Sequence, residues 1–483
     1  MTLNVVIGAA TSAAGETCFL PSWSGRLGAR IARSFAIPGD IAVPANVGDR
    51  LRVARSVGRS TRTAVVVSMG PVETCTAEIL RRVGGAIAAE IRAIKCQQAV
   101  IDMAEIVGAK VDNGVRAFCE GLVLGSFRFD RHKTTAEKEL PCRIVLAFAD
   151  GGRQWRTDVS RGIATADGVN EARRIAHEPA NVINPITLAA ETRRLARRDG
   201  LKCRVLDHEA MKRLNMGGLL AVGNSSQTPP RLIVLAHGDV RRQRPVILIG
   251  KAVTFDTGGY SIKDKQGIVG QKYDKCGGTA VMGVLSAAAA LRFKVPVVGI
   301  IAAAENMIAA SAYRPNDIIR TMAGKTVEII STDAEGRMVL ADALTYAQKH
   351  YKPRAMINLA TLTGGIVVAL GRTRAGLFAN NTELSDRLYA SGQRTFERLW
   401  PMPLDDDYFE LLRSDDADMR NSAGRDAHPI LGGVFLKQFV DPQTPWAHLD
   451  IAGVSAVDKP GPYCPAGGTG FGVRLLCDYL ESL

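Results

Sequence analysis

Hydrophobic and polar positions alternate in blocks along this chain of 483 residues, and the blocks predict alternating strands and helices. The β-branched run 63–70 predicts a strand that ends at glycine, and "CRIVLAFAD" at 142–150 predicts another. Between them, residues 74–95 repeat apolar positions at helical spacing. The polar stretch 128–141 predicts an exposed loop. This first part of the chain therefore reads as a small α/β domain.

The pattern becomes more apolar in the second part of the chain. Helical segments at 278–292 and 339–350 separate runs that are almost continuously apolar, as in strands of a sheet covered on both faces. These runs span residues 245–250, 295–306, 326–332 and 355–364. Such alternation implies a mostly parallel central sheet flanked by helices, which binds ligands at the carboxyl ends of its strands.

Proline marks a boundary between these two parts, because Pro179 and Pro185 follow a helical stretch. We therefore expect an α/β protein with a smaller N-terminal α/β domain over residues 1–165, a linker helix over 166–184 and a larger C-terminal domain over 185–483. A hydrophobic content of 46% allows both to bury a core.

Composition excludes several classes of protein. No stretch reaches the roughly 18 continuous apolar residues that a membrane span needs, so we expect no membrane association. The opening "MTLNVVIGAATSAAG" has no basic segment, so we expect no secretory signal. The nine cysteines are scattered without a CxxC pair, which argues against a disulfide framework or a zinc ribbon. We expect a cytoplasmic protein.

Part of the net charge of +13 lies in runs of arginine. Their members are Arg50, Arg52, Arg55, Arg59 and Arg62, then Arg193, Arg194, Arg197 and Arg198, then Arg241, Arg242 and Arg244. Two interpretations stay open, namely solvated faces or a phosphate-binding surface. The runs are not interleaved with aromatic residues, so stacking on single-stranded nucleic acid is not indicated.

Three polar clusters lie where apolar strands are predicted to stop. They contain Lys251, Asp256 and Lys263, then Asp274, then Asp333, Glu335 and Arg337. Four unpaired carboxylates in one cleft would repel one another and cost several kcal/mol in desolvation. Two explanations stay open at this point. The basic residues could neutralise the acids in a buried network, or two divalent cations could lie between the carboxylates.

The sequences of these clusters resemble the motifs of one family. "GKAVTFDTGGYSIK" (250–263), "KYDKCGG" (272–278), "STDAEGRM" (331–338), "NLATLTGG" (358–365) and "WAHLDIAGV" (446–454) occur in the order found in the leucyl aminopeptidase (cytosol aminopeptidase) family. The resemblance covers roughly residues 165–483, with Ser331 in the place of the usual asparagine. The N-terminal domain resembles the family only in size and α/β character.

The resemblance implies a metal-dependent aminopeptidase that releases the N-terminal residue of peptides with a water molecule activated by two metal ions, Zn²⁺ or Mn²⁺. By motif match, Asp256 and Glu335 would bridge both ions. Asp333 would complete one site, and Lys251 and Asp274 would complete the other. A lysine ligand must be neutral, and two adjacent dications disfavour its ammonium form.

The resemblance also implies catalytic roles. Lys263 would polarise the scissile carbonyl, and Arg337 together with Leu362 would hold a bicarbonate ion that serves as general base.

For substrate binding, the matched positions are Lys263, Gln271, Thr361, Gly364 and Ser455. Gln271 stands where the family often has methionine, and Ser455 is also polar, so we expect a weaker preference for leucine.

Partners follow from the resemblance as well. It implies a homohexamer, built as a dimer of trimers with active sites facing an interior cavity. Some bacterial members of the family also bind DNA, so an additional regulatory role through the basic surfaces is the alternative function. A catalytically dead relative is disfavoured, because every matched ligand is present.

Overall fold

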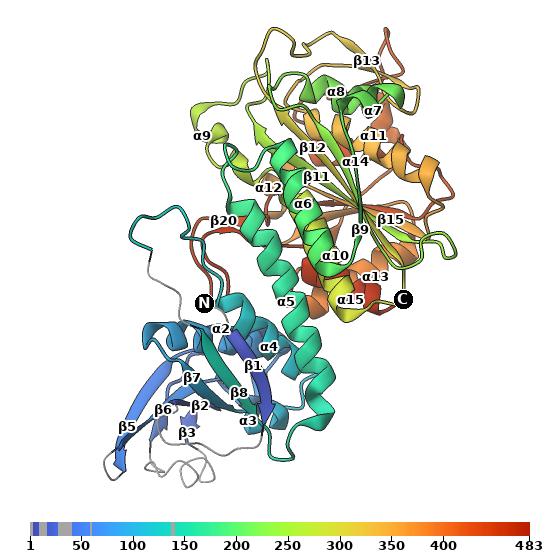
Figure 1. The fold of residues 1–483 in the computed structure, drawn as a ribbon. Coiled ribbons are helices and arrows are strands. Elements are labelled where there is room, and N and C mark those ends of the chain that lie inside the picture. The colour runs from blue at the N-terminus through green and yellow to red at the C-terminus, as the bar shows by residue number, and fades with distance from the viewer. Residues whose placement is uncertain (1–2, 9–16, 28–40, 58–59, 137–140) are drawn as a thin grey trace. The chain divides into compact units, whose positions relative to one another are not determined.

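The computed structural model describes residues 3–8, 17–27, 41–57, 60–136 and 141–483. The chain divides into two compact units (Figure 1). Unit 1 comprises Met1–Asp167 with Lys459–Ala466, and unit 2 comprises Gly168–Asp458 with Gly467–Leu483. The helix expected over 166–184 is α5, which runs from Arg156 to His177 and so carries the division within it. Within the described ranges, every helix is too short or too polar to cross a bilayer.

Unit 1 is built on a six-stranded sheet with the order β1-β8-β7-β2-β6-β5. All neighbours in it are parallel except the hairpin β5–β6. The bounds are β1 Leu3–Gly8, β2 Thr17–Ser22, β5 Arg50–Val57, β6 Ser60–Ser68, β7 Gln98–Asp102, β8 Cys142–Ala147, α2 Ala77–Ala93, α3 Ala104–Gly108 and α4 Gly114–Gly125, with the short pair β3 Gly25–Arg26 and β4 Ala42–Val43. The predicted strands at 63–70 and 142–150 and the helix at 74–95 are confirmed as β6, β8 and α2.

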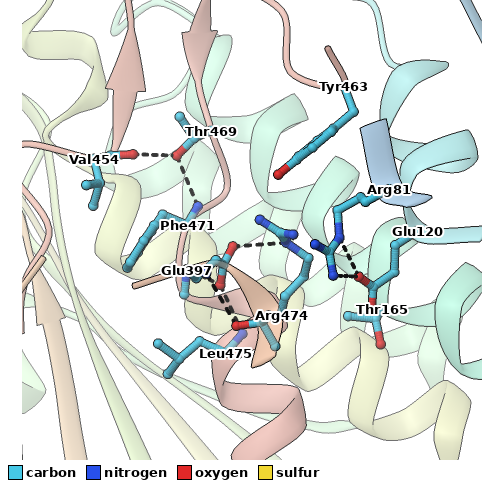
Figure 2. A network of polar contacts seen from close by, with 12 residues as sticks. Arg81, Glu120, Thr165, Glu397, Val454, Tyr463, Thr469, Phe471, Arg474 and Leu475 are labelled. Carbon is cyan, nitrogen blue, oxygen red and sulfur yellow. Dashed lines mark hydrogen bonds and ion pairs between the residues drawn. The ribbon is translucent and has the colours of Figure 1, made fainter. Parts of the chain in front are cut away.

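Helix α2 forms because its sequence supplies both a cap and an apolar face. The Thr76 side chain accepts a hydrogen bond from the Ile79 amide, which satisfies one free donor of the first turn. The helix buries its apolar stripe in the core of unit 1. It is joined to α4 by a buried ion pair in which Arg81 Nη2 lies 2.9 Å from Glu120 Oε2 (Figure 2). The Tyr463 hydroxyl donates to Glu78, which ties segment 459–466 to this unit.

Unit 2 is built on an eight-stranded sheet with the order β17-β16-β19-β15-β11-β12-β10-β9. The central strands β19, β15, β11 and β12 are mutually parallel, whereas β10 and β9 on one side and β16 on the other join antiparallel. The bounds are α6 Pro185–Asp199, β9 Lys202–Leu206, α7 His208–Arg213, α8 Gly217–Gly223, β10 Arg231–His237, β11 Val246–Asp256, α9 Lys265–Ile268, α10 Cys276–Leu291, β12 Val297–Asn306, α11 Glu335–His350, β15 Ala355–Ala360, α12 Gly364–Leu370, β16 Ala375–Ala379, α13 Thr382–Thr395, β17 Leu399–Pro401, α14 His428–Lys437, β19 Trp446–Asp450 and α15 Val473–Glu481.

Helices cover both faces of this sheet (Figure 1). Neighbouring residues of a strand point to opposite faces. A side chain at Gly250 would meet α10, whereas the side chain of Lys251 reaches the first turn of α11. The last helix of the chain, α15, is capped at its start by Glu397, which accepts hydrogen bonds from the amides of Gly472 and Leu475 (Figure 2). Between the two helical layers, every residue of β11 but one is buried.

The prediction of a central strand over 326–332 is wrong. Only Thr326–Glu328 is extended (β14), and it pairs with β13 (Ile318–Arg320) and β18 (Met419–Arg420) in a separate three-stranded sheet. The reason lies in the backbone beyond Glu328. The amides of Ile330 and Ser331 donate to the Asn421 side chain instead of to a neighbouring strand. The apolar run therefore leads into a turn and not into the sheet.

Candidate metal and catalytic site

Strand β11 supplies the first two residues of the site. Lys251 lies inside the strand and Asp256 is its last residue, and each is only 2% exposed. The Lys251 side chain points at the start of α11, where residue 336 is glycine. A Cβ atom at Gly336 would lie 2.8 Å from Lys251 Nζ, so a glycine there makes room for the lysine.

Lys251 joins three separate segments. Its ammonium group lies 2.6 Å from Glu335 Oε1 and 2.9 Å from Asp274 Oδ1, and it donates to the Thr361 carbonyl at 2.9 Å. Burial acts to lower the pKa of this lysine, but the surrounding carboxylates outweigh burial and raise it. The protonated lysine is therefore a counterion in the absence of other cations.

Lys263 makes the second junction. Its ammonium group lies 2.9 Å from Asp256 Oδ2 and also pairs with Asp333. The loop after β11, which carries Lys263 to the cluster, turns at Gly258. The φ of Gly258 is 87°, in the region that favours glycine, and a Cβ atom there would lie 2.4 Å from the Ser261 carbonyl oxygen. Burial opposes the charge of Lys263, yet the same acids raise its pKa.

The acids of the cluster carry more charge than the two lysines neutralise. Four carboxylates against two ammonium groups leave a formal charge of −2 in a largely buried site. Burial raises the pKa of Asp274 to about 7 and that of Glu335 to about 6, and it also raises the pKa of Asp333. Among the described buried atoms, Asp274 Oδ2 has no hydrogen-bond partner. An excess of buried negative charge and an unpartnered carboxylate oxygen are features that divalent cations would relieve.

The spacing of the oxygens also fits metal binding. Asp256, Asp333 and Glu335 each offer one oxygen, and the three atoms lie within 4.8 Å of one another. Oxygen donors suit hard divalent cations, and the lysine nitrogen adds a donor when it is neutral. The residues present therefore fit a metal centre better than a self-neutralised ion-pair network.

The predicted position of these residues at strand ends needs correction. Only Asp256 ends a strand of the central sheet. Asp274 directly precedes the N-cap of α10, and Glu335 is the first residue of α11, a helix that starts four residues before the predicted 339. The positive end of a helix dipole stabilises a carboxylate by about 0.3–1 kcal/mol. Helix N-termini and one strand end thus build the site together.

Arg337 lies two residues beyond Glu335 and is 1% exposed. Its Nη1 donates to the Asn421 carbonyl at 2.7 Å, and its guanidinium stands 5.9 Å from the Phe435 ring centre. None of the described carboxylates pairs with it within 4 Å, and its buried Nε has no partner. Burial lowers its pKa to about 10, so it remains a cation at neutral pH. A buried cation with spare donors can hold an anion.

Of the five predicted substrate residues, Lys263 and Thr361 contact the cluster directly. The Thr361 hydroxyl donates to Asp274, and the Ser455 carbonyl accepts from the Cys276 thiol at 3.8 Å. Gln271 lies just before Asp274 and donates to the Gly267 carbonyl at 2.7 Å, while Gly364 begins α12 and is exposed.

Leu362 and Arg337 lie near each other, since both side chains approach Gly432. An atom at the Cβ position of Gly432 would be 3.0 Å from Leu362 Cδ2 and 3.6 Å from Arg337 Nη2. Its amide already donates to Asp450 at 3.1 Å.

Three polar residues of the site were missed from the sequence. Asn306 is fully buried and donates to Asp256 Oδ1 at 2.8 Å. Asp450 is fully buried and accepts from the Leu362 amide and from the Thr363 hydroxyl at 2.7 Å. Asn421 anchors the backbone before Asp333. A signal was available for two of them, because Asn306 ends β12 and Asp450 ends β19, as Asp256 ends β11.

The basic runs are partly neutralised. Arg50 and Arg52 both pair with Glu90, while Arg194 and Arg198 pair with acids on or beside α5 and α6. Arg59 and the side chains of Arg55 and Arg62 lie outside the described residues. Two of the three runs therefore offer less free charge than the sequence indicates.

Comparison with known proteins extends the likeness to the N-terminal part of the chain. The family model described as the catalytic domain of the cytosol aminopeptidase family matches residues 170–477, and the model described as its N-terminal domain matches 45–136. The second match corrects the expectation that the N-terminal domain shares only size and α/β character with the family.

Individual relatives agree with these matches. A probable cytosol aminopeptidase from Syntrophotalea carbinolica is 41% identical over 441 residues, which cover 90% of this chain and 88% of the relative. One from Brucella suis is 46% identical over 363 residues, covering 74% and 72%. The solved structure of the bottromycin maturation enzyme BotP in complex with Mn is 32% identical, with a TM-score of 0.87 and coverage of 97% of this chain and 99% of that chain. The chain therefore belongs to the metal-dependent cytosol aminopeptidase family and is an aminopeptidase, a hydrolase of the leucyl aminopeptidase type.

Proposed function

We propose that this aminopeptidase removes the N-terminal residue of peptides with two divalent metal ions held at the cluster around Lys251. The observation that carries the proposal is the convergence of four carboxylates on two lysines, with excess negative charge and an unpartnered buried oxygen on Asp274. Ion pairing among these residues alone does not balance the charge.

The ligands divide naturally between two ions. Asp256 and Glu335 would bridge both, Asp333 would complete the site nearer Lys263, and Lys251 and Asp274 would complete the other. This division agrees with the contacts, since Lys263 pairs with Asp256 and Asp333 whereas Lys251 pairs with Asp274 and Glu335. When bound, the ions supply the Lewis acidity that amide hydrolysis needs.

Two cationic side chains would act on the substrate and its base. Lys263 carries its charge at the solvent-accessible edge of the cluster, with a side chain 17% exposed, and would donate to the scissile carbonyl oxygen. Arg337 would hold a bicarbonate ion as general base, with Leu362 beside it. Among the described residues, the Asn421 carbonyl is the one hydrogen-bond acceptor of Arg337 and its Nε has no partner, which supports an anion there.

The first side-chain pocket would be formed around Gln271, Thr361, Gly364 and Ser455. Polar groups at 271 and 455 reduce the gain from burying an apolar residue, so the preference for leucine should be weaker than in an all-apolar pocket. Rates on a panel of residue–amide substrates test this, and a strong leucine optimum would contradict it. The Gln271→Met variant should shift the preference toward leucine.

Metal analysis combined with one matched pair of variants tests the central proposal. Wild-type protein should contain close to two divalent ions per chain, lose activity with a chelator and regain it with Mn²⁺ or Zn²⁺. Asp333→Ala should lose one ion and at least about 100-fold in activity. Glu410→Gln, which removes an acid from an exposed pair with Arg413, should change neither.

A metal-free protein that is fully active, or an Asp333→Ala variant that keeps both ions, would refute the two-metal site. Use of Zn²⁺ or Mn²⁺ in the cell, the homohexamer and nucleic-acid binding stay predictions from the resemblance. The pairing of Arg50, Arg52, Arg194 and Arg198 with acids weakens support for a nucleic-acid surface on those segments.

A further inference from the structure

The third basic run has a different environment from the other two. Arg241, Arg242 and Arg244 lie in the loop between β10 and β11 and line a cavity of about 900 Å³. The lining residues that the structure describes include one acid, Asp239, which is 3.6 Å from Arg242 and accepts from two backbone amides of its own loop. This run is therefore not neutralised by neighbouring helices.

Two other segments bring further cations to the same cavity. Lys202 and Arg204 come from β9, and Lys349 and Lys352 come from the end of α11 and the turn after it. The wall therefore holds seven cationic side chains against one carboxylate, a formal charge of +6. A concave surface of one sign concentrates the field and attracts ions of the opposite sign.

Part of this charge is available to a ligand. Arg244 donates to the Pro353 carbonyl and Lys349 to the Met322 carbonyl. By contrast, the side chains of Arg204, Arg241 and Lys352 make no ion pair or hydrogen bond with any described residue, and all three are exposed. Within the described ranges, these three cations at the cavity have no polar partner.

Part of the remaining wall is apolar and aromatic, beside the polar side chains of Gln243, Gln348 and His350. Val234, Ala236 and Pro245 form part of the lining together with half-buried Tyr351. The volume falls within the range of small-molecule sites, about 300–1,000 Å³. The chemistry fits a compact anion with several charges.

The cavity is remote from the metal cluster. It lies at the start of β11 and the end of α11, whereas Lys251 lies further along that strand and Glu335 at the opposite end of that helix. Fifteen residue steps of α11 separate Glu335 from His350, about 22 Å at 1.5 Å per residue. A ligand bound there would not touch the catalytic residues.

We propose that this cavity is a binding site for a small anion with three or more phosphate charges, such as an inorganic oligophosphate or a nucleoside triphosphate. Arg204, Arg241 and Lys352 are its free cationic contacts, and Tyr351 with the apolar wall would accommodate an organic part.

The test is calorimetric titration of the metal-loaded enzyme at low salt with sodium tripolyphosphate, ATP and a 20-base-pair DNA duplex. The cavity variant R204Q/R241Q/K352Q should bind the favoured small anion at least about tenfold more weakly, because three of its counter-charges are removed. Wild-type binding should also weaken as salt is added. The control K212Q/R387Q/R413Q removes three exposed cations elsewhere in unit 2 and should bind like wild type. Both variants should keep aminopeptidase activity, which shows that they are folded.

The titrations with the three ligands distinguish the possible outcomes. Tighter binding of ATP than of tripolyphosphate indicates an organic phosphate, and the reverse indicates an inorganic one. Binding that is equally strong in the cavity variant would place the anion elsewhere, for example at the metal ions, and would overturn the proposal. Failure of both small anions to bind, or binding of the duplex alone, would also overturn it.

Discussion

Gly336 is the second residue of α11, and the structure predicts that replacing it with alanine damages the site. A Cβ atom there would lie 2.8 Å from Lys251 Nζ and 2.9 Å from its Cδ and Cε, closer than carbon atoms approach in packed proteins. The lysine cannot easily move aside, because it is 2% exposed and held by Asp274, Glu335 and the Thr361 carbonyl. The added methyl group therefore displaces the lysine from its partners.

The magnitude follows from two opposing effects. Alanine is favoured over glycine in a helix by about 1 kcal/mol, so propensity alone predicts a more stable protein. Overpacking costs about 1–3 kcal/mol, and a displaced lysine leaves two buried carboxylates with a weaker counter-charge, which costs about 3–5 kcal/mol when the pair is fully broken. We expect a net destabilisation of about 1–3 kcal/mol in the metal-free protein. Because Lys251 is a proposed ligand, metal affinity and activity should fall about 10–100-fold.

Urea unfolding of four proteins measures the effect, namely wild type, Gly336→Ala, Lys251→Ala and the double variant. With the lysine shortened, the clash disappears, so Gly336→Ala should become neutral or stabilising in the Lys251→Ala background. Gly108→Ala in α3 is the control, because a Cβ there meets nothing within 4 Å. A Gly336→Ala protein as stable and active as wild type, or the same cost in both backgrounds, would show that the lysine does not need this glycine.

Three further variants test other parts of the argument. Arg337→Lys removes the guanidinium that donates to the Asn421 carbonyl and that would hold the bicarbonate base. It should lower kcat about 100-fold with little change in KM, since the bound base and not the substrate is affected. Steady-state kinetics showing a raised KM alone would contradict this role. Asn306→Ala removes a hydrogen bond to Asp256 and should weaken metal affinity about 10–100-fold, measured by competition with a chelator, and unchanged affinity would count against it. Burial raises the pKa of Asp342 to about 7, so the folded state holds its proton more tightly than the unfolded state, and stability is lost as pH rises from about 4 to about 7. Asp342→Asn should lack that loss, so its stability relative to wild type should improve by a few kcal/mol between pH 5 and pH 8. Urea unfolding at both pH values checks this, and a constant difference would disprove it.

The sequence by itself determined the elements whose signal is local. The apolar runs at 245–250, 295–306 and 355–364 identify β11, β12 and β15, because a strand buried on both faces must be apolar at nearly every position. The motifs around Lys251 and Glu335 identified the family for the same reason, since they are short and contiguous. The prediction of a strand over 326–332 was wrong, because composition does not show where the backbone amides donate. The run is equally apolar whether they donate to a neighbouring strand or to the side chain of a distant asparagine.

Only the tertiary structure decided which charges meet. Lys251 contacts Asp274, Glu335 and Thr361, residues 23 to 110 positions away, because parallel strands and two helix N-termini converge at one edge of the sheet. The same holds for the arginines, since the sequence does not reveal that Glu90 pairs with both Arg50 and Arg52. Charge balance at a site is a sum over segments that are remote along the chain. Sequence periodicity reports only on neighbours a few residues apart, so it does not predict the charge balance of the site.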